Sequence, residues 1–188
     1  VGQLNRPAYP DLKGSSVFAG KTFHSARWDH DYDLKGKRVA VVGTGASAIQ
    51  FIPEILSQVA HIDVYQRSAP YVLPKPDKRY GRLKKALFRN FPLLQTLDRG
   101  WQYSYHELRQ LGLNFRVNDS SIVDRVFRRH LRASVEDADL RSRLTPEYPI
   151  GCKRILISNH WYKALVDPKV EVVDKGIAEI LPSSIKTC

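Results

Sequence analysis

The chain has 188 residues, of which 43% are hydrophobic and 26% charged, a composition typical of globular domains. It contains no run of eighteen apolar residues, so the sequence predicts no transmembrane helix. The formal net charge is +11. The basic residues between positions 78 and 154 do not form a tract with interleaved aromatics, so we predict no nucleic-acid binding. The spacing of the two cysteines, Cys152 and Cys188, and of the six histidines fits neither a metal site nor a disulfide framework, so we predict no metal. The few cysteines favour a reducing, cytoplasmic location.

Residues 1–33 are loop-like, with prolines and glycines as punctuation and no signal-peptide pattern. We expect this start to be the interior of a longer chain. The segment contains the pattern F-x-G-x-x-x-H-x-x-x-W-D, formed by Phe18, Gly20, His24, Trp28 and Asp29. Taken alone, a histidine in such a loop is most simply a hydrogen-bonding structural residue, and the tryptophan a packing anchor.

A strand, a glycine turn and a helix follow this segment. Residues 37–42 are a short run rich in β-branched residues that stops at Gly43, which is typical of a buried parallel strand. Apolar residues then recur at helical spacing over 46–60, where Pro53 either kinks the helix or sits in its first turns. Residues 62–66 form the next predicted strand, which completes a β-α-β unit.

The turn between this strand and helix has the pattern of a dinucleotide site. Gly43 permits a tight turn, Gly45 lets phosphates approach the backbone, and Ala48 lets helix and strand pack closely. The helix N-terminus adds positive potential. The predicted cofactor contacts here are Gly43, Thr44, Gly45, Ala46, Ser47, Ala48 and Gln50.

The end of the second strand indicates which dinucleotide is bound. An NAD site usually has a carboxylate there, whereas this chain has Gln66, Arg67 and Ser68. A guanidinium and a hydroxyl can bind a 2′-phosphate, so we expect NADPH, with Arg67 and Ser68 as contacts. The alternative is that Arg67 is simply a solvated surface residue.

Further along the chain, glycine and proline become less frequent and arginine more frequent. This change predicts a helical insert over 78–146, with amphipathic stretches near 93–111 and 122–131. Beyond it we expect an apolar segment at 154–158, a short helix at 161–165, and strands at 170–174 and 177–181. The predicted fold is α/β: a Rossmann-like three-layer dinucleotide-binding domain with a parallel sheet and a helical insertion. It divides into a linker (1–33), the first part of the domain (34–77), the insert (78–146) and a truncated remainder (147–188).

Two motifs together carry a family resemblance. The fingerprint at 18–29 and the glycine turn at 43–48 resemble those of the type I Baeyer–Villiger monooxygenases. Related flavin-containing monooxygenases, which oxidise nitrogen and sulfur, end a similar motif in Phe or Tyr, so Trp28 and Asp29 favour the Baeyer–Villiger branch. Residues 64–68 and 148–154 are also similar to family segments. The resemblance covers nearly the whole chain and is least diagnostic in the insert.

The resemblance implies an enzyme that uses NADPH, FAD and O2 to convert ketones into esters or lactones through a C4a-peroxyflavin. It implies that Lys153 joins in 2′-phosphate binding and that Arg154 is the catalytic arginine. Without the resemblance, both would be read as capping a loop. The fingerprint residues become an interdomain linker, with His24 acting on domain movement. The FAD domain would be mostly absent, so this piece alone is expected to be inactive and to pack against that domain in the full-length protein.

Two alternatives stay open. One is a related flavoprotein, either an N- or S-oxygenating monooxygenase or a pyridine-nucleotide disulfide reductase. The reductase is disfavoured because no C-x-x-x-x-C pair is present, although such a pair would lie outside this region. The other is a stand-alone NADP-binding module that never meets FAD, against which the fingerprint and the start of the chain argue.

Overall fold

The computed structural model describes residues 6–77, 79–114 and 122–188, and its centre is a parallel three-stranded sheet. The sheet has the order β1 (Arg38–Val42), β2 (His61–Tyr65), β5 (Val170–Val173), with Val41 opposite Val64 and Val64 opposite Val172. Ile62 and Val64 are fully buried, whereas His61, Asp63 and Tyr65, which alternate with them, are partly exposed. This alternation directs one face of β2 into the main core.

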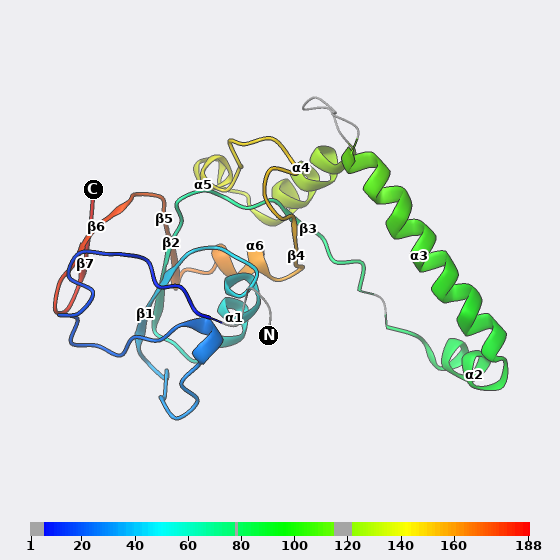
Figure 1. The fold of residues 1–188 in the computed structure, drawn as a ribbon, viewed down its shortest axis with the longest axis horizontal. Helices are drawn as coiled ribbons and strands as arrows, with labels where there is room; N and C mark the ends of the chain where they lie inside the picture. Colours follow the sequence, from blue (N-terminus) through cyan, green and yellow to red (C-terminus); the bar gives the residue numbers. More distant parts are fainter. Residues whose placement is uncertain (1–5, 78, 115–121) are drawn as a thin grey trace.

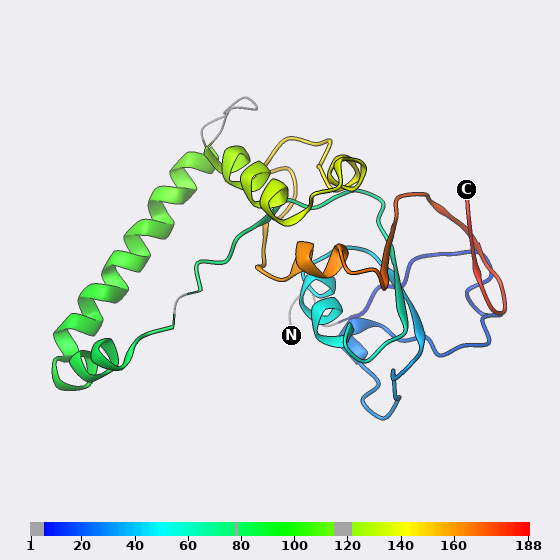
Figure 2. The ribbon, with the colours of Figure 1, turned by 180° about the vertical axis from the view of Figure 1, so that it is seen from behind.

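Two helices cover that face of the sheet (Figures 1 and 2). They are α1 (Ala48–Ile55) and α6 (Trp161–Leu165), which pack against each other. Ile52 and Trp161 have no exposed surface. Pro53 lies inside α1, which ends at Ile55, five residues before the predicted end at residue 60. The chain turns there because Gln58 and Val59 both donate to the carbonyl of Ile55.

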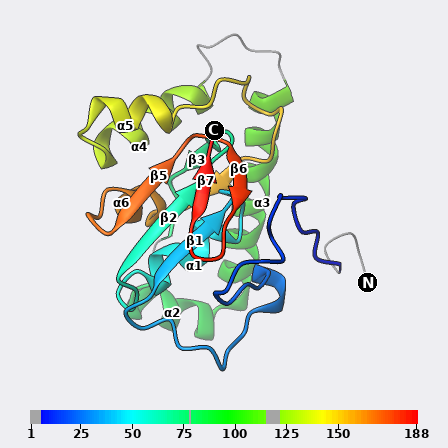
Figure 3. The ribbon, with the colours of Figure 1, turned by 90° about the vertical axis from the view of Figure 1, so that its left-hand side faces the viewer.

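A hairpin and the N-terminal segment lie on the other face. The strands β6 (Ile177–Ile180) and β7 (Ile185–Thr187) are antiparallel, and Figure 3 shows them in front of the sheet. Ala19 donates to the carbonyl of Pro182 at 2.8 Å, and Ile180 to that of Lys13 at 2.7 Å. The α/β prediction with a parallel sheet is confirmed, and the third layer consists of this hairpin and the extended segment.

A second parallel pair, β3 (Val72–Leu73) and β4 (Leu156–Ile157), lies under α4 (Ile122–Ser134). The ring of Phe127 on α4 is fully buried and meets Tyr71 edge-on at 4.9 Å. The short α5 (Ala138–Arg143) follows. The second half of the predicted insert therefore belongs to the core of the α/β body.

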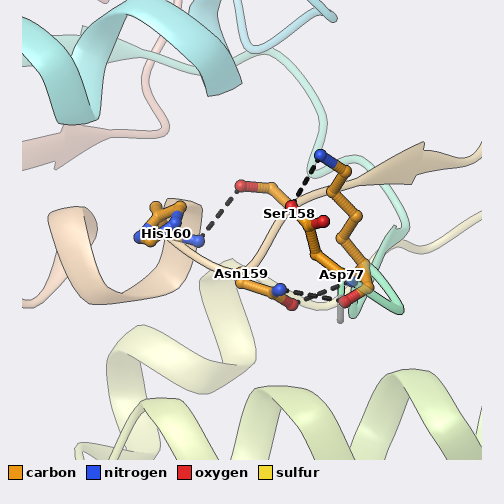
Figure 4. Close-up of polar contacts among 5 residues, drawn as sticks. Asp77, Ser158, Asn159 and His160 are labelled. Carbon is orange, nitrogen blue, oxygen red and sulfur yellow. Dashed lines mark hydrogen bonds and ion pairs between the residues drawn. The ribbon is translucent and has the colours of Figure 1, made fainter. Parts of the chain in front are cut away.

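The β3–β4 pair is extended by side chains (Figure 4). Asn159 donates to the carbonyl of Lys75 at 2.9 Å, and its own carbonyl accepts from the Lys75 amide at 2.8 Å. The hydroxyl of Ser158 accepts from the amides of His160 and Trp161, which starts α6. These contacts fix where the chain leaves the body toward residue 77.

The first half of the insert projects from the body as a hairpin of α2 (Arg82–Asn90) and α3 (Pro92–Asn114) (Figures 1 and 2). No residue of α2 is buried. Residues 1–5, 78 and 115–121, which fall in the predicted linker and insert, lie outside the described residues. No helix in the described part of the chain is long and apolar enough to cross a membrane.

Candidate dinucleotide site

The glycine turn joins β1 to α1 in a conformation that requires glycine. Gly43 has a φ of +103°, in the left-handed region, and its amide donates to the carbonyl of Tyr65 at 2.9 Å. The turn is thereby fixed at the carboxyl end of β2. At Gly45 a Cβ would meet no atom within 4 Å, so this glycine leaves open space where a ligand can approach the backbone.

Backbone donors at this turn are available to an anion. Within the described residues, the amides of Gly45, Ala46 and Ser47 have no backbone acceptor, and Ile49 donates to the carbonyl of Gly45 at 3.2 Å. Unsatisfied amides at a helix start, together with the helix dipole, suit phosphate groups. The local geometry is therefore compatible with a pyrophosphate site at the turn, which stays a prediction.

A cavity of about 320 Å³ adjoins the turn. It brings together three segments that are distant in the sequence: the turn, the loop after β2, and the stretch leading to β4. Its lining residues are Thr44, Gly45, Ala46, Ser68, Pro70, Tyr148, Lys153, Arg154 and Leu156. Six of the predicted site residues are among them, including Lys153 and Arg154.

Lys153 is held in place by two contacts. Its Nζ donates to Oγ of Ser68 at 2.7 Å and lies 4.3 Å from the centre of the Tyr148 ring. Tyr148 is itself positioned by the Tyr71 hydroxyl, which donates to its carbonyl at 3.1 Å. Partial burial raises the pKa of Tyr148. Tyr148 is not among the predicted site residues, because a single aromatic before a proline carries no sequence signal of its own.

A tight turn carries Lys153 and Arg154 to the cavity. Cys152 donates to the carbonyl of Pro149 at 3.2 Å, and Gly151 between them has a φ of +89°. This is the geometry of a type II turn, which favours glycine at its third position. Both cysteines of the chain are free and exposed.

The cavity has an excess of positive charge. In the described part of the chain, no carboxylate lies within 4.0 Å of Lys153 or Arg154. A salt bridge at the protein surface usually adds little stability. Cations without a carboxylate partner around a concave site, in contrast, attract anionic ligands. A phosphorylated dinucleotide meets this requirement.

The remaining predicted contacts lie beside the cavity rather than in its lining. Arg67 is exposed at the end of β2, directly before the lining residue Ser68. Gln50 donates to the carbonyl of Ala46 at 2.8 Å and so braces the turn. Ala48 is buried, as close packing of helix and strand requires, and Gly43 and Ser47 shape the turn.

The fingerprint forms a compact local structure away from the cavity. Phe18 covers Gly20, where a Cβ would come within 2.5 Å of the ring. Nδ1 of His24 accepts from the amide of Ala26 at 3.0 Å and caps the short helix η1 (Ser25–Arg27). The residue types of the motif thus follow from close packing and capping.

Trp28 and Asp29 complete that structure. Trp28 stacks edge-on with Phe23 at 5.1 Å and with Phe51 of α1 at 5.2 Å, which docks the segment onto the body. Asp29 pairs with Lys21 at 2.6 Å, and the hydrogen bond from that lysine lowers the pKa of the carboxyl. The fingerprint is therefore joined to the helix that starts at the glycine turn.

One cluster of possible metal ligands lies on the sheet. The ligand atoms of His61, Asp63 and Glu171 lie within 4.8 Å of one another, and spacing along the sequence did not reveal them because they come from two strands. Asp63 is already paired with Arg38 at 3.2 Å and with His61 at 3.1 Å. Asp63 therefore has two partners within the protein, and the cluster itself carries no metal assignment.

Two glycine substitutions separate ligand contact from backbone strain. Gly45→Ala is expected to fold normally but to bind NADPH roughly tenfold more weakly or worse, because its methyl group enters the ligand space. Gly43→Ala is expected to cost about 1–2 kcal/mol of stability, because alanine resists a positive φ. Calorimetric titration and thermal unfolding of both variants check this. Normal NADPH binding by Gly45→Ala would remove the turn from the site.

No protein-family model matches the chain. The chain is 50% identical over 185 residues to a protein named Baeyer-Villiger monooxygenase from Pseudomonas aeruginosa, a match that spans 98% of this chain and 35% of that protein. It therefore spans about a third of the length of the curated relatives it matches.

Solved structures match as well. A steroid monooxygenase bound to NADP is 28% identical with a TM-score of 0.77, covering 96% of this chain and 42% of that one. OTEMO in complex with FAD and NADP is 26% identical, also with a TM-score of 0.77, covering 99% and 43%. The chain is thus homologous to a segment of larger monooxygenases.

Proposed function

We propose that this homologue of the Baeyer–Villiger monooxygenases is the NADPH-binding part of a longer flavoprotein. The whole flavoprotein would oxygenate ketones to esters or lactones. The single observation that carries the proposal is the cavity in which the glycine turn, Lys153 and Arg154 meet.

The residues present fit a dinucleotide. Gly45, Ala46 and Ser47 offer backbone amides for the pyrophosphate, and the absence of a Cβ at Gly45 gives it room. Lys153 and Ser68 lie 2.7 Å apart and can bind the 2′-phosphate together, with Arg67 next to them along the chain. A cavity of about 320 Å³ is in the range of small-molecule sites, and the turn continues the surface beyond it.

When bound, NADPH supplies the hydride and FAD the site of oxygen activation. This chain contributes charge and position. Arg154 places a permanent guanidinium in the same cavity as the dinucleotide residues, so it can stabilise negative charge on the reacting oxygen atoms. Pro70 and Leu156 supply apolar surface to the lining of the same cavity.

The fingerprint fits a structural and conformational role. It lies outside the cavity and docks onto α1 through Trp28, so a movement of the linker would act directly on the helix that starts at the glycine turn. We assign His24 to this linker rather than to chemistry. Residues 1–33 would be the linker, and 34–77 and 147–188 would be two parts of the NADP-binding domain, to whose core α4 of the predicted insert also contributes. The FAD domain would pack against them.

Product analysis of the full-length protein tests the proposal. With NADPH, O2, a ketone and a thioether offered separately, we expect an ester or lactone from the ketone. Sulfoxide formation with no ester would instead favour the N- or S-oxygenating branch. NADPH binding by a full-length protein that holds no flavin would favour a stand-alone module.

A further inference from the structure

The projecting α2–α3 hairpin carries an exposed apolar face. On α3, Leu93, Leu97, Trp101 and Leu108 are 70, 61, 73 and 66% exposed. Their spacing of four, four and seven residues places them on one side of the helix. Leu83 and Phe91, on α2 and at its end, are 75% and 58% exposed. Contiguous apolar surface of this kind on a helix marks an interaction site.

The hairpin does not use this face for its own stability. Polar groups hold it together instead: Lys84 of α2 lies with Nζ 2.7 Å from Asp98 Oδ1 of α3, and the hydroxyl of Tyr80, just before α2, lies 3.0 Å from Asp98 Oδ2. Gln102 donates to the same carboxylate at 2.7 Å. Lys84 also lies over the rings of Tyr80 and Phe88. The polar side of α3 is thus turned toward α2, and the leucines and Trp101 are left outside.

The solved relatives extend well beyond the segment that matches this chain. Structural matches to them span 96 to 99% of this chain, and the 9 and 23 residues of α2 and α3 are too many to fall in the remainder. These relatives therefore have a counterpart of the hairpin. More than half of each relative's chain lies outside the match.

We propose that the apolar face of α3 is a docking surface for the part of the same polypeptide that lies outside residues 1–188. This inference rests on the proposed function, in which the chain is one part of a longer flavoprotein. The covering surface should therefore be apolar where it meets Leu93, Leu97 and Trp101.

A matched pair of variants in the full-length protein tests the docking. Trp101 and Tyr103 are exposed aromatics on the same helix, 73% and 68% exposed, and they point to opposite sides. Trp101→Asp is expected to lower the melting temperature by roughly 5 °C or more, because it would place a charge in the covered face, whereas Tyr103→Asp should change it little. Equal effects of the two variants would overturn the proposal.

A second measurement does not depend on a destabilising change. Trp101→Phe keeps the face apolar. The difference in tryptophan fluorescence between the wild-type full-length protein and this variant is therefore the emission of Trp101, which reports its surroundings. We expect that fluorescence to be shielded from iodide. If iodide quenches it freely, nothing covers the face and the proposal fails.

Two other occupants are outcomes that would overturn the proposal. Flotation with phosphatidylglycerol vesicles that is lost in Trp101→Asp would assign the face to a lipid surface. A dimer in sedimentation that Trp101→Asp dissociates would assign it to a second copy. Ketone oxidation by the wild-type protein is assayed separately, so failure of the proposed function and failure of the docking give different results.

Discussion

Arg154→Ala in the full-length protein is expected to lower the rate of ketone oxygenation by about 10²- to 10³-fold, the usual effect of removing one donor to a developing oxyanion. Arg154 lines the cavity beside Lys153 and the glycine turn, and no described carboxylate neutralises it. Arginine carries a delocalised positive charge with several donors, which suits it to bind a developing oxyanion. Product formation per unit time with a ketone, NADPH and O2 measures the effect.

Two companion variants make this result specific. Arg129→Ala removes an exposed arginine on α4 that does not line the cavity, so it should oxygenate at the parental rate. Arg154→Lys keeps the charge but loses the planar, multiple donors, and it should recover only part of the activity. An Arg154→Ala protein as active as its parent would exclude the catalytic assignment.

Lys153→Ala is expected to weaken NADPH binding by about 10- to 100-fold, which corresponds to the loss of one charge-assisted hydrogen bond. NADH binding should change little, because NADH has no 2′-phosphate. The contact to Ser68 at 2.7 Å and the Tyr148 ring hold the ammonium in one place before the ligand arrives, so little side-chain entropy is lost on binding. Calorimetric titration with NADPH and NADH measures both affinities.

Lys163→Ala serves as the control, since it removes an exposed lysine of α6 outside the cavity. Arg67→Ala belongs in the same series. A reduced preference for NADPH would place Arg67 at the 2′-phosphate, and an unchanged preference would leave it a surface residue. If Lys153→Ala weakened NADPH and NADH equally, Lys153 would not be the 2′-phosphate contact.

The β-α-β unit, the glycine turn and the short helix at 161–165 could be predicted from the sequence because each depends on nearby residues. Apolar alternation, β-branched residues and the two glycines determine β1, the turn and the start of α1. The fingerprint is similar: Phe18 on Gly20, His24 capping Ala26 and Lys21 on Asp29 all lie within a dozen residues. Local chemistry is sufficient to identify such elements.

The rest required the tertiary structure, because it depends on which distant segments meet. The contact between Lys153 and Ser68 joins positions 85 residues apart, and Tyr148 enters the site only because Tyr71 and the Lys153 ammonium reach it. The two halves of the insert look alike as amphipathic sequence. Burial of Phe127 against Tyr71 nonetheless places α4 in the body, while α3 projects with Trp101 in solvent. Periodicity shows that a helix has an apolar face, but only the packing of the whole chain decides what that face meets.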